Sequence, residues 1–220
     1  MELQNKIALV IGAGEMPGSS IAIELARAGA KVVVEGSAGV QEKVLRTVEK
    51  FGGDALPIRG DMAIETDVRH VVANIKAILG DVDIVVNAYP TRNVDRLIEE
   101  TSYDEWDQIH GNKIRAAFLC CKVLIPSMKR RGSGQIISIG SSRLVGQNSG
   151  QTAITASEYG ILGLSNALAK ELAGTGIQVL YMSPVDHIAS SQEGIFDISA
   201  DSPDSFAKSV VLKTKQSFIV

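Results

Sequence analysis

The fold of this chain is decided by one stretch near its N-terminus, Ile7-Ala8-Leu9-Val10-Ile11-Gly12-Ala13-Gly14-Glu15-Met16-Pro17-Gly18. Its first five residues are consecutively apolar, which is typical of a strand that is buried on both faces. The glycines that follow let the backbone approach a ligand closely, and residues 18–28 continue with helical periodicity. A glycine-rich loop between a strand and a helix favours a phosphate site at the helix N-terminus. The alternative interpretation is a turn in which a glycine adopts a positive φ.

Short apolar runs alternate with longer segments of helical periodicity along most of the chain. Strands are predicted over residues 7–11, 32–35, 55–58, 84–87, 135–139 and 178–182, and helices over residues 18–28, 40–51, 66–79, 106–130 and 152–172. This alternation predicts an α/β fold, a Rossmann-type doubly wound parallel sheet with helices on both faces, in a single domain over residues 1–220. Residues 185–220 are more polar and irregular, with one further helix expected over residues 204–213.

Composition limits the partners and the compartment. The 220 residues carry a formal net charge of -3, which argues against nucleic acid or an anionic membrane surface as the partner. No apolar stretch is long enough to span a bilayer, and the N-terminus lacks the apolar core of a signal peptide, so we expect a cytoplasmic protein. Cys120 and Cys121 are sequence neighbours without the spacing of a disulfide or a metal site, and no metal is predicted.

Several landmarks between residues 6 and 184 make the chain similar to the short-chain dehydrogenase/reductase family. They are the glycine loop, Asp61-Met62 after the third strand, Val82-Asp83-Ile84-Val85-Val86-Asn87, Gly134-Gln135-Ile136-Ile137-Ser138-Ile139, and Ala156-Ser157 with Gly160 and Gly163-Leu164. The resemblance implies a sheet in the order 3-2-1-4-5-6, an oxidoreductase scaffold and a nicotinamide dinucleotide cofactor. It also implies a seventh strand. Because the chain stops at Ser217-Phe218-Ile219-Val220, which resembles the approach to that strand, we expect the seventh strand to be missing or truncated.

The resemblance also locates an active site, in which the family uses a serine, a tyrosine, a lysine and an asparagine. The tyrosine is the general acid/base, and the lysine lowers its pKa. Carried over by spacing, the serine is Ser141, but the tyrosine position is Ile154 and the lysine position is Glu158. The asparagine position falls on Lys113, one residue after Asn112. Only the serine is kept, so we expect that no catalytic set is intact.

Two further predictions follow from these exchanges. Tyr159 is a poor substitute for the missing tyrosine, because five residues of helix after Ile154 turn it away from Ser141. Lys113 and Glu158 have the charges of an ion pair, and we predict that they come within salt-bridge range and fill the vestigial site. The alternative is two unrelated surface charges.

The loops that would hold the cofactor are altered as well. Weak or absent NAD(H) binding is expected, with its candidate residues Gly12, Gly14, Gly18, Asp61 and Asn87. Met16 replaces the family's second loop glycine and Tyr89 stands in the loop after the fourth strand, so both side chains are expected to obstruct the groove. Pro17, expected at the first helical position, lacks an N–H donor. Glu35 is placed to receive a ribose hydroxyl, which keeps weak NAD binding as an alternative, whereas no arginine is present there for the 2′-phosphate of NADP.

Three functional hypotheses result. The first is a catalytically inactive subunit that supports an active paralogue in a hetero-oligomer through residues 106–130 and 152–172, which are apolar around most of the helix circumference. Its pattern of losses is similar to that of the inactive subunit of the two-subunit hydroxyacyl-CoA dehydrogenase of anaerobic toluene (benzylsuccinate) degradation. The second is an NAD-dependent oxidoreductase, a lyase or an isomerase with its acid/base relocated to Ser141 and Glu158. The third is a module that senses NAD(H) without turnover.

Overall fold

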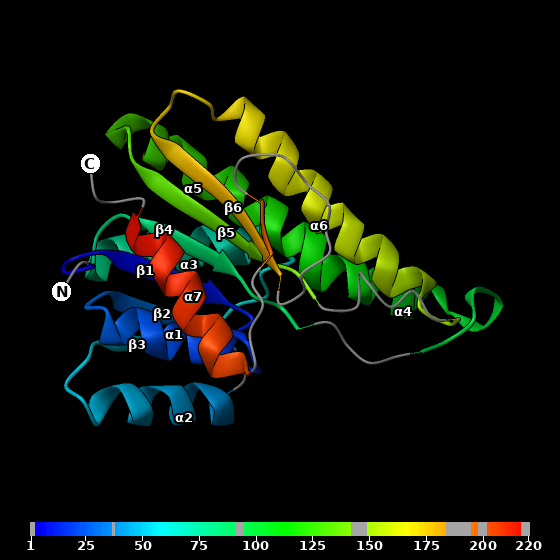
Figure 1. The fold of residues 1–220 in the computed structure, drawn as a ribbon, viewed down its shortest axis with the longest axis horizontal. Coiled ribbons are helices and arrows are strands. Elements are labelled where there is room, and N and C mark those ends of the chain that lie inside the picture. The colour runs from blue at the N-terminus through cyan, green and yellow to red at the C-terminus, as the bar shows by residue number, and fades with distance from the viewer. Residues whose placement is uncertain are drawn as a thin grey trace.

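A single parallel sheet organises the chain, and its strands alternate with helices (Figure 1). The computed structural model describes residues 3–36, 38–90, 95–141, 149–183, 195–197 and 202–216. The sheet order is β3-β2-β1-β4-β5-β6-β7, and each neighbouring pair is parallel. The strands are β1 (Ile7–Ile11), β2 (Lys31–Glu35), β3 (Ala55–Ile58), β4 (Ile84–Asn87), β5 (Gly134–Ile139), β6 (Ile177–Ser183) and β7 (Ile195–Asp197). The predicted doubly wound order 3-2-1-4-5-6 is therefore confirmed.

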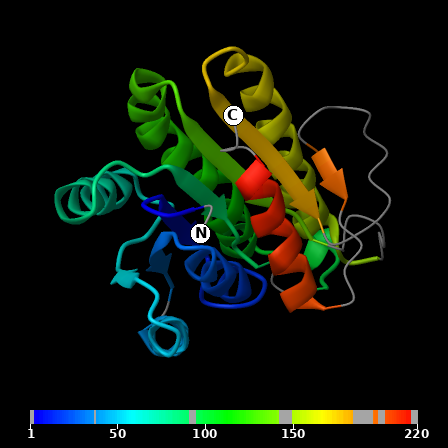
Figure 2. The same cartoon turned by 60° about the vertical axis from the view of Figure 1, so that its left-hand side comes forward.

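Helices cover both faces of this sheet (Figures 1 and 2). One face is covered by α1 (Gly18–Arg27), α2 (Ala38–Glu49) and α7 (Pro203–Gln216). The other is covered by α3 (Glu65–Ile78), α5 (Ala116–Arg131) and α6 (Thr152–Glu171), with α4 (Tyr103–His110) leading into α5 after a 3-10 turn at Ile98–Glu100. In the described part of the chain, none of these helices combines the length and apolarity that crossing a membrane requires.

The two faces of the sheet explain why its strands are consecutively apolar. All five residues of β1 are buried. Ala8 and Val10 pack with α1 and α7 on one side, while Ile7, Leu9 and Ile11 pack with α3 and α5 on the other. A strand covered on both faces has no position at which a polar side chain reaches water, and this produces the unbroken runs seen in the sequence.

The helix predicted over residues 106–130 is present, but it contains a π-helical turn that the sequence did not predict. A π-helical turn at Gly111–Arg115 separates α4 from α5. Glycine weakens an α-helix at this point, and one extra residue per turn changes the direction in which the following side chains point. Lys113, in the middle of the turn, is buried rather than exposed.

A short seventh strand is present. The three residues of β7 pair in parallel with β6, with Tyr181 opposite Ile195, at the far edge of the sheet (Figure 2). The seventh position is thus short rather than missing, and it is formed by a segment that precedes α7. The terminal residues 217–220, expected to approach that strand, lie outside the described residues.

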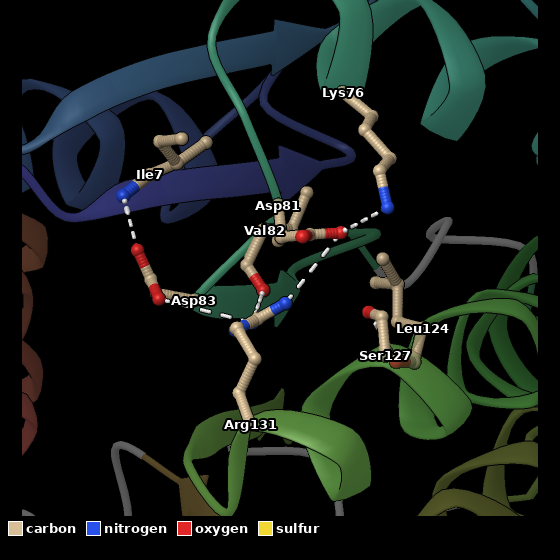
Figure 3. Close-up of polar contacts among 8 residues, drawn as sticks. All are labelled: Ile7, Lys76, Asp81, Val82, Asp83, Leu124, Ser127 and Arg131. Atoms are coloured by element: carbon tan, nitrogen blue, oxygen red, sulfur yellow. Dashed lines mark hydrogen bonds and ion pairs between the residues drawn. The ribbon is translucent and has the colours of Figure 1, made fainter.

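The amino ends of the central strands are joined by charged side chains (Figure 3). The Asp83 carboxylate accepts a hydrogen bond from the Ile7 N–H at 3.0 Å, which links β4 to β1. Arg131, at the end of α5, donates to the Val82 carbonyl at 2.7 Å and lies 3.6 Å from Asp81 and 3.8 Å from Asp83. These contacts hold together the amino ends of the strands, at the edge of the sheet opposite the loops that form the candidate site.

Candidate functional site

The residues of the vestigial active site come from three elements. Ser141 follows the carboxyl end of β5, Lys113 lies in the π-helical turn, and Glu158 lies in the first half of α6. Gly160 allows α6 to approach the turn, because a Cβ atom at this position would lie 2.5 Å from the Ile114 side chain. The close packing of α6 on the turn brings the three residues together.

Lys113 and Glu158 form a buried ion pair. The Lys113 Nζ donates to Glu158 Oε1, and the two side chains are only 9% and 1% exposed. The second oxygen, Glu158 Oε2, accepts the backbone N–H of Ser141 at 3.1 Å. The prediction of an ion pair is confirmed, and the alternative of two unrelated surface charges is wrong. Glu158 therefore ties α6 to the π-helical turn and to the residue that follows β5.

On α6, neither the family's tyrosine position nor the tyrosine that follows it in the helix supplies a replacement. Ile154 is buried in the core and has no proton to transfer. Tyr159 is 51% exposed on the outer side of α6, which confirms that it points away from Ser141. Asn112 is exposed on the π-helical turn, while Lys113 takes the inward position. The assignment of Ser141, Ile154, Glu158 and Lys113 to a vestigial site stays a prediction, now with a defined geometry.

The candidate cofactor groove lies at the carboxyl ends of β2, β1 and β4. The Glu35 carboxylate accepts the N–H of Gly12 at 2.8 Å, and its carbonyl oxygen accepts the N–H of Ala13 at 3.0 Å. Gly12 has a φ of 73°, and a Cβ atom there would lie 2.5 Å from the backbone of Tyr89. Glycine is therefore required at this position by the close approach of the loop to the end of β4.

Tyr89 connects the other side of the groove to Glu35. Its phenol lies near the Glu35 carboxylate, and its ring packs against the apolar layer between the sheet and α5. Burial raises the pKa of the Glu35 carboxyl above its usual range, although the hydrogen bonds from Gly12 and Tyr89 oppose this rise. Burial also raises the pKa of the Tyr89 phenol, and the charge of Glu35 raises it further.

The other predicted cofactor residues are placed less favourably for a dinucleotide. The Asp61 carboxylate accepts the N–H of Ala63 at 2.8 Å and so closes a local turn. Met16 is 60% exposed, so of the two residues expected to obstruct the groove only Tyr89 is packed into the protein. Pro17 is the N-cap of α1 and not its first residue. Gly14 and Gly18 lie in the loop and at the helix start, as expected.

Two observations test whether a dinucleotide fits these residues. In its favour, both amide atoms of the buried Asn87 lack a hydrogen-bond partner within the described segments. Against it, the first loop N–H is already bonded to a carboxylate, and an aromatic ring lies beside it. A phosphate needs free N–H donors and no adjacent negative charge. The expected weak or absent NAD(H) binding therefore stays a prediction. Over the described ranges, no group of three or more His, Cys, Asp or Glu side chains is placed to hold a metal ion.

Sequence reasoning missed two features of this site. The π-helical turn was missed because Gly111 alone does not distinguish it from a regular helix. The proximity of Glu35 and Tyr89 was missed because the two residues were judged separately. The predicted strand order could have revealed this proximity. β2 and β4 are the two neighbours of β1, so residues at their carboxyl ends lie on either side of its end.

A doubly wound sheet with a glycine loop after β1 is the scaffold of dinucleotide-binding dehydrogenases, and the comparisons with known proteins agree. The family described as short chain dehydrogenase matches residues 6–190, and the chain belongs to this family.

The similar curated proteins are named as reductases. The 3-oxoacyl-acyl-carrier-protein reductase FabG of Staphylococcus epidermidis is 30% identical over 211 residues, which cover 95% of this chain and 85% of that protein. The enzyme of the same name from Salmonella typhimurium is 34% identical over 185 residues, which cover 84% and 74%. The crystal structure of a metagenomic short-chain oxidoreductase in complex with NADP superposes with a TM-score of 0.86 at 26% identity, covering 100% of this chain and 95% of that one.

Proposed function

We propose that this chain is a non-catalytic member of the short-chain dehydrogenase family that supports an active homologous subunit in a hetero-oligomer. The observation that carries the proposal is the buried pair of Lys113 and Glu158 at the family's asparagine and lysine positions, together with Ile154 at the tyrosine position. A general acid/base must reach the substrate and exchange a proton with it. Glu158 is 1% exposed, and both of its oxygens are engaged.

The same contacts weigh against a relocated catalyst. A glutamate acts as a general base when it lies in an apolar pocket without a neutralising partner, as in enzymes that raise its pKa. Here the Lys113 ammonium group lies directly against one carboxylate oxygen and the Ser141 N–H donates to the other, so neither oxygen is open to a substrate proton. The backbone N–H of Ser141 donates to Glu158, so this hydrogen bond holds α6 against the residue that follows β5.

The outer face of α6 supports the proposed association. Ala156, Tyr159, Gly163 and Ala167 are exposed and lie three or four residues apart, which places them on one side of the helix. From Tyr159 to Ala169 the helix carries no charged residue. The helix lies along the outside of the structure (Figure 1), and on α5 the Phe118 ring is exposed as well. Surface helices normally present charged residues to water, so this face is suited to contact a second subunit.

The substrate class of the active partner follows from the relatives. The curated relatives are named as reductases of 3-oxoacyl groups on acyl-carrier protein. A hydroxyacyl-CoA carries the corresponding reduced group on another thioester carrier. We therefore propose that the active partner interconverts a 3-oxoacyl and a 3-hydroxyacyl thioester, and that the complex resembles the two-subunit hydroxyacyl-CoA dehydrogenase arrangement.

The absence of turnover is tested with the purified full-length chain, NADH or NADPH, and acetoacetyl-CoA as the probe thioester. We expect no oxidation of either nucleotide above the rate without protein. Turnover that disappears in Glu158→Gln would refute the proposal and establish a relocated acid/base. Turnover that survives in Glu158→Gln would also refute it, because the chain would then be an enzyme of another mechanism.

The association is tested by native mass spectrometry of the complex isolated from its natural source. We expect this chain together with a second polypeptide of similar mass. Gly163→Arg is the diagnostic variant, because a side chain at this position meets no atom of the subunit within 4 Å. Gly39→Arg on α2 is the matched control, since it is equally unobstructed. Loss of the partner in Gly163→Arg alone supports the proposed face; a complex unaffected by Gly163→Arg, or a chain without any partner, contradicts it.

A second candidate function is favoured by one observation. The buried amide of Asn87, which lacks partners in the described segments, is suited to bind a ligand or water at the carboxyl end of β4. This favours a subunit that binds NAD(H) without turnover. Saturable NADH binding by the wild-type chain would distinguish this role from purely structural support.

A further inference from the structure

A short arm, residues 95–107, contains the start of α4 and lies at the end of the molecule where α6 begins (Figure 1). The Arg96 N–H donates to the Gly150 carbonyl at 2.7 Å, and the Gln151 side chain donates to the Asp95 carboxylate at 3.2 Å. Both contacts join the arm to the residues just before α6. The arm is therefore held in a fixed position and presents a defined surface.

The arm is strongly acidic and also exposes apolar side chains. It contains six acidic residues and one basic residue, Arg96, which pairs with Glu105 at 3.2 Å. Three of the acidic side chains are exposed and make no ion pair with any described residue: Glu99, Glu100 and Asp104. Three large apolar side chains of the arm are exposed as well: Leu97 (42%), Ile98 (55%) and Tyr103 (80%). Apolar area beside uncompensated negative charge is suited to a protein partner whose contacting surface is basic.

The opposite end of the same helices has the opposite charge. β5 and β6, which follow α5 and α6, begin side by side with Gly134 opposite Ile177, so both helices end together. In the last turn of α5, Lys129 and Arg130 are exposed and make no ion pair with the described part of the chain. The 16 residues of α5 place this basic end about 24 Å from the start of the helix. The outer surface of α5 and α6 is thus acidic at one end and basic at the other.

This difference in charge selects one of two orientations for a homologous subunit on the outer face of α5 and α6. Parallel packing of two such helix pairs places one acidic arm against the other, and like charges in contact are strongly unfavourable. Antiparallel packing about a two-fold or pseudo-two-fold axis places each acidic arm over the basic end of the other subunit. In such an interface the two contacts are reciprocal, so the arm contributes twice.

From this charge distribution we infer that the supported subunit docks antiparallel on α5 and α6, with a basic helix end over the arm of this chain and its own acidic arm over Lys129 and Arg130. The inference deepens the proposed function and rests on it, because it takes the occupant of this face to be a homologous subunit. It adds the orientation of the partner, the chemistry of its contacting surface and a second contact region beyond the uncharged face of α6. The exposed apolar side chains of the arm are covered in this arrangement.

The charge contact is tested by biolayer interferometry of the full-length chain with the partner purified from the natural complex. Glu100→Lys is expected to raise the Kd at least about tenfold at about 50 mM salt and less than about threefold at about 500 mM salt, because salt screens a contact between exposed charges. Glu49→Lys is the matched control. It makes the same change of charge at an exposed position of α2, on the opposite face of the sheet, and should bind as the wild type does at both salt concentrations.

The orientation is tested by cross-linking the intact complex with a carbodiimide, which joins carboxylates to lysines, and with a dihydrazide, which joins two carboxylates. We expect carbodiimide links from the arm of this chain to lysines at the end of the partner's long helix, and from Lys129 to carboxylates of the partner's arm. Dihydrazide links between the two arms would show parallel packing and overturn the inference. Equal binding of Glu100→Lys and Glu49→Lys would overturn it as well. In both of these cases the partner still binds and the proposed function stands, whereas native mass spectrometry that finds no partner overturns both.

Discussion

Replacing Lys113 by methionine removes one charge of the buried pair while keeping a side chain of similar length. Glu158 stays buried at 1% exposure, and the Ser141 N–H donates to its Oε2. Removing one partner of a buried ion pair costs about 3–5 kcal/mol, because the remaining charge is left uncompensated. For a chain of this size each kcal/mol lowers the Tm by about 2–4 °C, so we expect a fall of roughly 6–20 °C.

The double variant Lys113→Met with Glu158→Gln separates the charge from the loss of packing. It carries no buried charge at the site, and the glutamine oxygen still accepts the Ser141 N–H. Replacing a whole buried pair is often nearly neutral, so the double variant should lie within about 2 kcal/mol of the wild type. Arg46→Met, which breaks the exposed pair with Glu42 on α2, is the control and should cost less than about 1 kcal/mol.

The assay is urea unfolding followed by circular dichroism, with the free energy of unfolding and the m-value fitted together. A cost below about 1 kcal/mol for Lys113→Met would refute the reasoning, since it would mean that Glu158 is not held as a buried charge. A double variant as unstable as the single variant would refute it as well, because packing rather than charge would then explain the loss.

Two further predictions concern titratable groups. Because burial raises the pKa of Glu35 in the folded protein, ionising Glu35 costs stability, and its favourable contribution at low pH is lost as the pH rises through the folded pKa. Glu35→Gln should therefore raise the Tm at about pH 8, with a gap to the wild type that closes towards about pH 4; a gap that is constant across this range contradicts the assignment. Burial also raises the pKa of the Cys121 thiol to about 12 and that of Cys120 further, so iodoacetamide at about pH 8 should modify neither cysteine in the folded protein and both in urea, as counted by mass spectrometry. Rapid modification of the folded chain would show that this part of α5 is open to solvent.

Much of the candidate site could be predicted because it depends on local spacing along one element. Ser141 follows the end of one strand, and Ile154 and Glu158 lie one helical turn apart on α6, so their spacing along the chain predicts where they lie. The helix period also places Tyr159 on the outer side of α6. The pairing of Lys113 with Glu158 could be predicted from complementary exchanges at two family positions. The π-helical turn that directs Lys113 inward could not, because its geometry depends on packing against α6 and not on its own five residues.

The amino-acid sequence by itself determined the layered architecture, since consecutive apolar runs and amphipathic segments can be buried only as a parallel sheet between helices. It also determined that, at the family's spacing, Ile154 and Glu158 stand at the tyrosine and lysine positions, because the residue at a given position is a property of the sequence alone. Only the tertiary structure decided what the remaining side chains do. Glu35 was expected to face a ribose, and its carboxylate accepts the Gly12 N–H with Tyr89 close by. Those partners lie far apart along the chain and meet only because β1 is placed between β2 and β4.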